Sequence, residues 1–481
     1  MRRIAELPSP WRYLVIALLV LAAILLLRWL EEEDGTARVA PPRIPLQHTG
    51  CVATTEIHFK LRPGATTALA GATPLFTHLP RTAAAVDDPR ARWRRLEVPA
   101  LHAAALVAAL DHDPAVEEAF VPPEVSLPQP IALRDGDSCP ITTPSFESYQ
   151  GYVGPAPSGI DAPAAWRRGV RGQGVWFADV EGGWNAQHED LPGDRIRHVA
   201  GQPINDPTWR QHGTAVLGEV VGKDNGKGVV GLAPDVERVF TASIGRMAVA
   251  DALDAAAEQL RPGDVLLIEL QGTGPRGRFL PVEFWDDNFD AIQAATRRGV
   301  VVIEAAGNGA ENLDHKSYKG KLSRAGRDSG AIVVGAGGPP RDGFVDRARL
   351  DFSNYGSRVD VQGWGRKVAT LDYGDLQRCD GPADRHYTGE FSGTSSASPI
   401  VAGAAVLLES YSRQTRGKPL APEVVRDLLR RTGTPQAAGI GGRGLSSGFA
   451  CTSGGCADLA DEQQNIGPRP DLARALAALE R

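Results

Sequence analysis

The chain has 481 residues, and because a single hydrophobic core stops growing at about 250 to 300 residues, this length predicts one large domain and a smaller one. Hydrophobic residues make up 42% of the sequence and charged residues 23%, which excludes a disordered or collagen-like chain. The net charge of -6 is small, and no basic stripe interleaved with aromatic residues occurs, so the composition argues against a nucleic-acid-binding protein.

The five cysteines are too few for a disulfide scaffold, and their spacing matches no zinc site. Cys451 and Cys456 enclose the flexible segment TSGG, so they are the first candidates for a disulfide bond in an oxidising compartment. Cys51 and Cys139 form a second candidate pair. This pairing scheme leaves Cys379 as an unpaired thiol.

An apolar run, YLVIALLVLAAILLL at residues 13–27, follows three arginines near the N-terminus. It is long for the core of a signal peptide and short for a membrane-spanning helix, which needs about 20 residues. Arg28 can snorkel and so extend the span, and no small-x-small cleavage site precedes the acidic residues 31–34. We therefore expect residues 1–30 to form a short cytoplasmic N-terminus and a transmembrane signal-anchor, with a removed signal peptide as the alternative. Because positive charge stays inside, the rest of the chain is expected to be extracytoplasmic.

Residues 31–50 contain three prolines and no periodic pattern, which predicts a linker. Residues 51–127 predict a small α+β domain. Its expected elements are strands at 56–63, 92–99 and 116–125 and a helix at 99–113. A second proline-rich linker is expected at 128–157.

In the large region from residue 158 to 481, short apolar strands alternate with alanine-rich helical segments. This alternation predicts an α/β fold with a mostly parallel central sheet and helices on both faces. The expected strands include 174–180, 264–270, 299–307 and 330–336. Ligands of such sheets bind at the carboxyl ends of the strands, so the polar residues that follow these runs are the candidates for a site.

Four polar residues stand at the end of an expected strand or at the start of an expected helix: Asp179, His212, Asn308 and Ser395. Each alone has an ordinary explanation, because aspartate and asparagine form turns, and serine caps helices. Together they supply the parts of an acyl-transfer site: a nucleophile, a general base, a group that orients the base, and an oxyanion donor. We therefore predict Ser395, His212, Asp179 and Asn308 in these respective roles.

The order Asp, His, Ser and the motifs GTSSASP, HGTA and AAGN resemble the subtilisin-like (subtilase) family from about residue 158 to the C-terminus. The segments IDAPAAW, HEDL, GVVGLAP and FSNYG fall in the same order as in that family. The resemblance implies a subtilisin-like fold and serine peptidase activity. It also implies that one strand pairs with the substrate backbone and that three small residues line a substrate side-chain pocket; these are Leu270, Gln271 and Gly272, and Ala305, Ala306 and Gly307.

Several residues depart from the family pattern. Val180 and Glu181 follow Asp179, where the family usually has Ser or Thr and then Gly, so the hydrogen bonding of Asp179 is left open. Ser396 stands where many relatives have a bulkier residue. Glu269 and Glu304 lie inside apolar strands, and buried carboxylates are costly unless paired. Either each has an internal partner, or one of them favours a basic substrate side chain.

The sequence thus predicts a membrane-anchored, extracytoplasmic serine endopeptidase that acts on proteins or peptides through an acyl-enzyme. An inactive subtilase-fold binding protein and a transpeptidase remain as alternatives. Residues 51–127 resemble an inhibitory propeptide in length and position, so they are expected to act as an intramolecular inhibitor that cleavage between Pro128 and Pro157 would release. No cofactor and no metal ligand set is predicted; related enzymes often bind structural calcium, but no DxDxDG loop is present.

Overall fold

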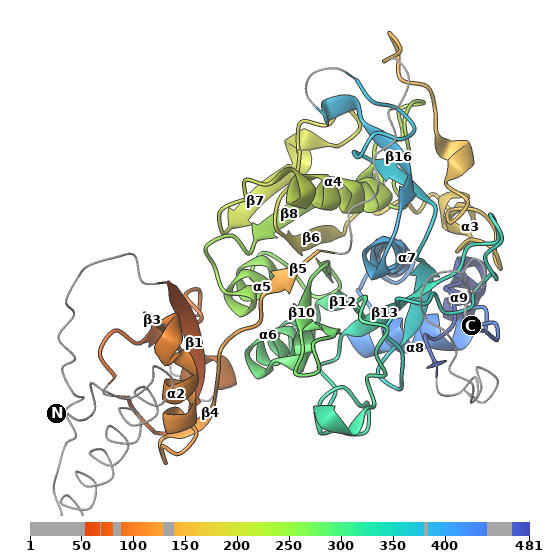
Figure 1. Cartoon of the computed structure of the whole chain (residues 1–481). Helices are drawn as coiled ribbons and strands as arrows, with labels where there is room; N and C mark the ends of the chain where they lie inside the picture. The colour runs from red at the N-terminus through yellow and green to blue at the C-terminus, as the bar shows by residue number, and fades with distance from the viewer. Residues whose placement is uncertain (1–52, 68, 80–87, 128–138, 380–382, 440–463) are drawn as a thin grey trace, which may run out of the picture.

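A computed structural model describes residues 53–67, 69–79, 88–127, 139–379, 383–439 and 464–481, and shows a small N-terminal domain beside a large one (Figure 1). The predicted signal-anchor and the predicted Cys451–Cys456 pair lie outside these ranges. No helix within these ranges is long and apolar enough to cross a membrane.

The large domain is built on a seven-stranded sheet in the order β14-β13-β12-β9-β6-β8-β7, and every neighbouring pair is parallel. The predicted parallel sheet is therefore confirmed. The strands are β6 (Trp176–Glu181), β7 (Ile196–Ala200), β8 (Arg238–Ser243), β9 (Val265–Ile268), β12 (Val301–Ala305), β13 (Ile332–Gly337) and β14 (Val361–Trp364). The strand order reverses between β6 and β9, and ligands of open α/β sheets bind at such a switch point.

Helices cover both faces of this sheet, as the sequence predicts. One face packs against α4 and α7, with α3, α8 and α9 further out, and the other face packs against α5 and α6. The helices are α3 (Ala162–Trp166), α4 (Pro207–Val221), α5 (Val249–Ala257), α6 (Asp286–Arg297), α7 (Thr394–Arg416), α8 (Pro422–Thr432) and α9 (Leu472–Leu479). Because side chains alternate along β6, Phe177 and Glu181 point toward α4 and α7, and Ala178 and Val180 point toward α5.

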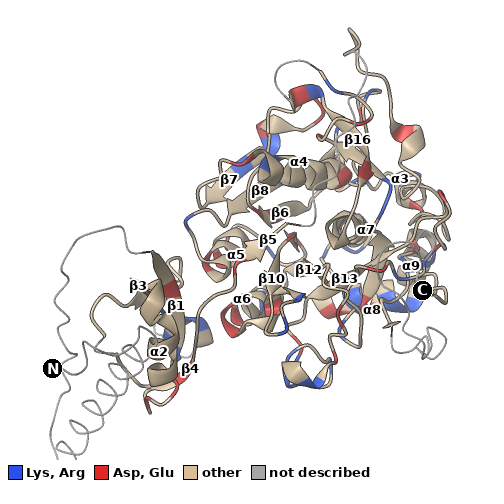
Figure 2. Ribbon diagram, in the orientation of Figure 1, with Lys and Arg blue, Asp and Glu red and all other residues tan. Residues whose placement is uncertain are grey.

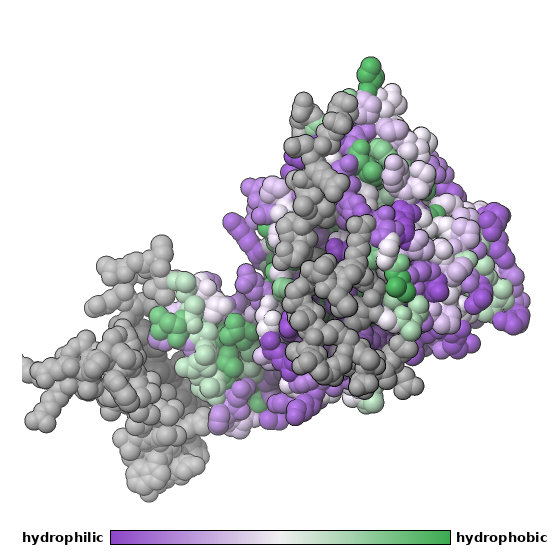
Figure 3. Space-filling view, turned by 45° about the vertical axis from the view of Figure 1, so that its right-hand side comes forward, coloured by the Kyte–Doolittle hydropathy of each residue, from purple (hydrophilic) through white to green (hydrophobic). Residues whose placement is uncertain are grey.

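The N-terminal domain is an antiparallel sheet in the order β2-β3-β1-β4 with one helix on it. Its elements are β1 (Thr54–Leu61), β2 (Thr73–Pro74), β3 (Trp93–Pro99), α2 (Ala100–Leu110) and β4 (Val116–Phe120). Figure 3 shows hydrophobic side chains on the visible face of this domain, and Leu101 on α2 is 73% exposed.

Two hairpins extend the large domain beyond its main sheet. Strand β10 (Gln271–Thr273) lies between β11 (Phe279–Pro281) and β5 (Val125–Ser126), and it is antiparallel to both. Strands β15 (Val368–Leu371) and β16 (Tyr387–Phe391) form the other hairpin. The loop of this second hairpin is tied by a Cys139–Cys379 disulfide. The prediction of an unpaired Cys379, and that of a Cys51–Cys139 pair, are therefore wrong, because the fold brings together two cysteines 240 residues apart.

Candidate active site

His212 and Glu181 form the centre of the candidate site. His212 lies in the second turn of α4, whose start is fixed by Asp206, since the Asp206 carboxylate accepts a hydrogen bond from the Thr208 N–H at 2.7 Å. Glu181 is the last residue of β6, and its Oε1 is hydrogen-bonded to Nδ1 of His212. Both side chains are at most 3% exposed. A carboxylate in this position fixes the ring and holds its proton on Nδ1, which leaves Nε2 as the proton acceptor.

Asp179, which the sequence analysis assigned to this position, has a different partner. Its Oδ2 accepts a hydrogen bond from Nε1 of Trp184 at 2.7 Å, and its Oδ1 has no partner. Asp179 and Glu181 are two residues apart on one strand, so they lie on the same face of the sheet, but only the later one reaches His212. The predicted contact between Asp179 and His212 is therefore corrected to a contact between Glu181 and His212.

Burial sets the charges of this pair and of the acids near it. Burial lowers the pKa of His212 to about 3, so the imidazole is neutral at neutral pH. Burial also raises the pKa of Asp179, Glu181, Glu219 and Glu269, each of which is at most 1% exposed. Among these four acids, the structure gives only Glu181 a hydrogen-bond partner that becomes a cation when it accepts a proton. Glu181 is therefore the acid that would stabilise an imidazolium at His212.

Ser395 lies in the first turn of α7, opposite α4 in the same hydrophobic core. Gly393 precedes this turn with φ 115°, a left-handed conformation that a residue with a Cβ rarely adopts. Nε2 of His212 has no hydrogen-bond partner. The ring of Phe391, four residues before Ser395, packs edge-on against the His212 ring, with 5.4 Å between the ring centroids. The site thus has a free imidazole nitrogen and a serine at a helix N-terminus, where the helix dipole favours a developing negative charge.

Asn308 is held so that its amide nitrogen stays free. Its Oδ1 accepts hydrogen bonds from the Thr394 N–H at 2.9 Å and from the Thr394 hydroxyl at 3.2 Å, and its own N–H donates to Gln271 Oε1 at 2.8 Å. Its Nδ2 is buried and has no partner. An unpaired donor next to the residue before Ser395 is what an oxyanion site requires.

Asn354, in the FSNYG segment, supports the Asn308 loop from the other side. Its Nδ2 donates to the carbonyl oxygens of Ala306 at 2.7 Å and Phe279 at 2.8 Å. Its Oδ1 accepts from the N–H groups of Gly309 and Glu311 at 3.1 and 2.9 Å. This one amide therefore fixes the backbone on both sides of Asn308.

The residues predicted to contact substrate lie beside Asn308. Gln271 and Gly272 belong to β10, whereas Leu270 is 1% exposed and packs in the core between the sheet and α5 and α6. The edge of β10 is filled by the chain's own β5, with Gln271 opposite Ser126 and Gly272 opposite Val125. Ala305, Ala306 and Gly307 are buried at the end of β12 and lead directly into Asn308.

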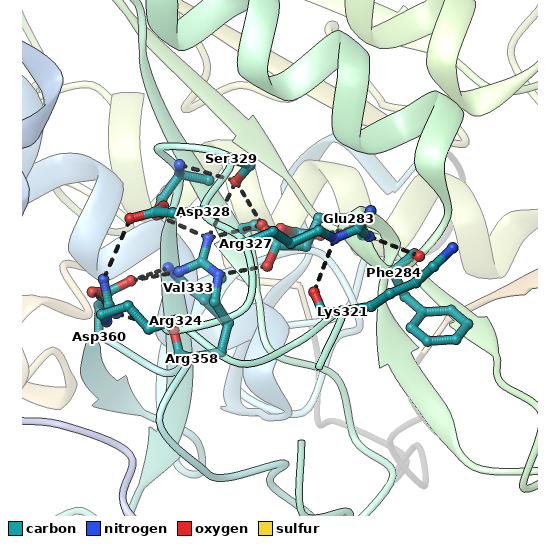
Figure 4. A network of polar contacts seen from close by, with 12 residues as sticks. Glu283, Phe284, Lys321, Arg324, Arg327, Asp328, Ser329, Val333, Arg358 and Asp360 are labelled. Carbon is teal, nitrogen blue, oxygen red and sulfur yellow. Dashed lines mark hydrogen bonds and ion pairs between the residues drawn. The ribbon is translucent and has the colours of Figure 1, made fainter. Parts of the chain in front are cut away.

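Both unexpected strand carboxylates have internal partners. Glu269 accepts a hydrogen bond from the Ser398 hydroxyl on α7. Glu304 accepts one from the Glu283 N–H at 2.9 Å, and the Glu283 carboxylate is paired with Arg358 at the centre of a polar network (Figure 4). These contacts favour the internal-partner explanation, since Glu269 is 1% and Glu304 0% exposed.

Comparison with known proteins identifies the fold and its activity. The model of the subtilase family (Peptidase_S8) matches residues 183–451, which is more than half of the chain. The chain belongs to the subtilase family. It is a subtilisin-like serine endopeptidase with protein substrates.

Three relatives illustrate the match. An intracellular serine protease of Paenibacillus polymyxa is 28% identical over 57% of this chain and 78% of its own length. An extracellular basic protease of Dichelobacter nodosus is 27% identical over 68% of this chain and 58% of its own length. Subtilisin Savinase of Lederbergia lenta is 28% identical over 61% of this chain and 97% of its own length.

Two residues of the site were missed by sequence reasoning, Glu181 and Asn354. The signal for Glu181 was present, because it stands directly before Gly182 and Gly183, at the end of the strand. Asn354 was noticed only as part of a segment, and its four hydrogen bonds are a property of the folded loop.

Proposed function

We propose that this subtilase hydrolyses peptide bonds with a Glu181–His212–Ser395 triad and with Asn308 as the oxyanion donor. The observation that carries the proposal is the hydrogen bond from His212 Nδ1 to Glu181, which leaves Nε2 free to take the proton of the Ser395 hydroxyl. Attack by Ser395 on the substrate carbonyl gives a tetrahedral oxyanion, which Asn308 Nδ2 and the N-terminus of α7 would stabilise. His212 then passes its proton to the leaving amine, and water hydrolyses the acyl-enzyme by the reverse sequence.

Replacing each carboxylate by its isosteric amide distinguishes the role of Glu181 from that of Asp179. Glu181→Gln is expected to lower kcat/KM by about 10³ to 10⁴, because an amide cannot stabilise the imidazolium and favours the wrong tautomer. Asp179→Asn is the matched control, and we expect less than about a tenfold loss, since a neutral group already accepts the Trp184 hydrogen bond there. Rates of peptide cleavage and of labelling by a fluorophosphonate measure both. A larger loss in Asp179→Asn than in Glu181→Gln would return the orienting role to Asp179.

We further propose that residues 1–30 anchor the enzyme in a membrane and that the catalytic domain lies on the extracytoplasmic side. The apolar run at 13–27 supports the anchor. The Cys139–Cys379 disulfide supports the compartment, because disulfide bonds persist in oxidising environments and are rare in reducing ones.

The N-terminal domain is proposed to act as an intramolecular inhibitor. Strand β5, at the C-terminal end of the segment 51–127, occupies the edge of β10 beside Asn308, where a substrate backbone would pair. A substrate can reach this edge only after β5 leaves. Release of the domain, after cleavage in the segment between Pro128 and Pro157 or without it, would then activate the enzyme.

A further inference from the structure

The N-terminal domain is held on the catalytic domain by buried polar contacts to four aspartates on α5 and α6. Lys60 forms an ion pair with Asp290 at 2.7 Å, and Nε1 of Trp93 donates to the same carboxylate at 2.9 Å. The remaining contacts join Thr77 to Asp251, Arg90 to Asp254 and His58 to Asp287. Figure 2 shows acidic residues on α6, on the side toward the N-terminal domain. In these contacts the catalytic domain supplies the acceptors and the N-terminal domain supplies the donors, whereas Lys321 of the catalytic domain donates to Glu118 of the N-terminal domain at 3.1 Å.

His58 differs from the other donors because its charge depends on pH in the physiological range. It lies on β1 and is 2% exposed. Its Nδ1 is 2.7 Å from Asp287 Oδ2 on the catalytic domain, and its Nε2 is 2.7 Å from Glu56 Oε1 on its own strand. A carboxylate can only accept a hydrogen bond, so both ring nitrogens must carry a proton. The docked geometry therefore requires an imidazolium.

The carboxylates around His58 are suited to this charge. Burial raises the pKa of Glu56, but the hydrogen bond from His58 and the charges of His58 and Arg95 together outweigh it and leave that pKa below its ordinary value. The second oxygen of Asp287 accepts a hydrogen bond from the N–H of Asn288 at 2.7 Å, so both carboxylate oxygens have a donor. The ring of Phe120 packs edge-on against the His58 ring, with 5.9 Å between the ring centroids, and shields the imidazole from solvent.

We propose that docking of the N-terminal domain onto α6 takes up one proton at His58, so that a rise to alkaline pH loosens the domain. The claim that this proton uptake regulates peptidase activity rests on the inhibitor function proposed above. The claim that docking takes up a proton rests on the contacts of His58 alone.

The sign of the effect follows from the two states. In the docked state burial lowers the pKa of His58, but its bonds to Asp287 and Glu56 raise it further, to about 9. In the undocked state Asp287 is gone and the ring meets water, so the pKa returns toward its ordinary value of 6.5. The contribution of His58 to docking is therefore complete below its ordinary pKa of 6.5 and is lost as the pH rises through about 9. Between these values the docking constant is expected to fall by up to about tenfold per pH unit.

The other charged groups at this interface do not cancel the effect. Burial, and then the nearby Asp286, raise the pKa of Glu118, which also pairs with Lys321 across the interface, so its ionisation acts in the same direction. Burial raises the pKa of Asp254 to about 6, so that group titrates below the pH range of interest. Lys60 and Arg90 face Asp290 and Asp254, and Arg95 lies near Glu56.

The test uses the full-length Ser395→Ala protein, in which the domains stay covalently linked. The ¹³Cε1 resonance of His58 is followed by NMR from pH 6 to 10, and hydrogen exchange of the α6 and β1 amides, corrected for intrinsic rates, reports docking. We expect His58 to titrate near pH 9, and protection of α6 to fall over the same range while protection of α7 is kept. Titration near pH 6.5 with α6 still protected would overturn the proposal, as would pH-independent protection.

Two variants make the test specific. Asp287→Asn keeps the shape of the acceptor but no longer requires a cation, so the dependence of α6 protection on pH is expected to flatten. His102→Asn, an exposed histidine on α2, is the matched control and should leave the dependence unchanged. Peptidase activity of the wild-type chain is measured over the same range. If docking follows pH and activity does not, the proton linkage stands and the inhibitor function fails.

Discussion

The carboxylate that contacts His212 belongs to Glu181, and glutamate is one methylene longer than the aspartate that the family resemblance implies. The longer side chain starts at the last residue of β6 and still meets Nδ1 of His212. Asp179, two residues earlier, lies deeper in the sheet and is bonded to Trp184. One strand thus carries two carboxyl groups on one face, and their different partners separate the one that contacts His212 from the one that does not.

Asn308 provides a prediction at this scale. Asn308→Ala removes the free Nδ2 donor, and kcat is expected to fall by about 10² to 10³ with little change in KM, because the donor acts on charge that develops only in the transition state. Steady-state kinetics on a peptide substrate measure this. Asn354→Ala serves as a comparison that should also lower the Tm, since Asn354 makes four hydrogen bonds in the loop. Unchanged kcat in Asn308→Ala would remove Asn308 from the mechanism.

Sequence reasoning assigned the contact with His212 to Asp179, whereas the structure gives that contact to Glu181, two residues later. Asp179 and Glu181 share the periodicity of one strand, so their pattern cannot say which of them meets a helix that arrives from elsewhere in the fold. The other expected residues lie where strand ends and helix starts place them: Asn308 after β12, and Ser395 in the first turn of α7.

At the scale of elements, a buried ionic network joins segments that are distant in sequence (Figure 4). Arg358 is 0% exposed, and it pairs with Glu283 before α6 and with Asp360 before β14. It also donates to the Ala331 carbonyl oxygen at 3.1 Å and so holds the start of β13. One guanidinium thus connects three parts of the domain near Glu304.

Arg358→Met is expected to lower the free energy of unfolding by about 3 to 5 kcal/mol, because it leaves Glu283 and Asp360 buried without their cation. Denaturant unfolding monitored by circular dichroism measures the loss. Arg431→Met is the control: its pair with Asp427 is an exposed i,i+4 contact, for which the expected change is below about 0.5 kcal/mol. Similar losses in both variants would contradict the assigned role of burial.

The Cys139–Cys379 disulfide gives a second prediction for an element, the β15–β16 hairpin loop. The double variant Cys139→Ser, Cys379→Ser is expected to lose about 2 to 4 kcal/mol of stability, since the bond closes a long loop in the unfolded chain. Reducing agent should lower the Tm of the wild type toward that of the variant and leave the variant unchanged. An equal effect of reductant on both proteins would assign the stability to another cause.

Some elements are determined by their local sequence, and others form only through contacts with distant segments. The strands expected at 174–180, 264–270, 299–307 and 330–336 are present, since each segment is mostly apolar. The short strands β5, β10 and β11 were not predicted as a sheet, because two or three residues show no period and form strands only through their neighbours. The disulfide could not be found either, since several pairings of five cysteines fit the spacing equally well.

At the scale of the whole molecule, anchoring and processing can be separated. In Ser395→Ala we expect the unprocessed chain in the membrane fraction, and deletion of residues 1–30 should move it to the soluble fraction, because the apolar run would be absent. Terminal sequencing of both fractions of the wild type then shows whether the N-terminal domain has been cut off between Pro128 and Pro157. An unprocessed wild-type chain that is active in the membrane fraction at a pH where the N-terminal domain stays docked would contradict the inhibitor function.

The N-terminal domain touches the catalytic domain at two separate places, the α5–α6 face and the edge of β10, and only residues 121–124, with two adjacent prolines, join them. A stiff, short connection gives each contact a high effective concentration for the other. If the N-terminal domain is the inhibitor proposed above, cutting the chain after β5 would not by itself release it, because a contact that opens re-forms while the other one holds. Activation would then depend on simultaneous loss of both contacts rather than on the cleavage itself.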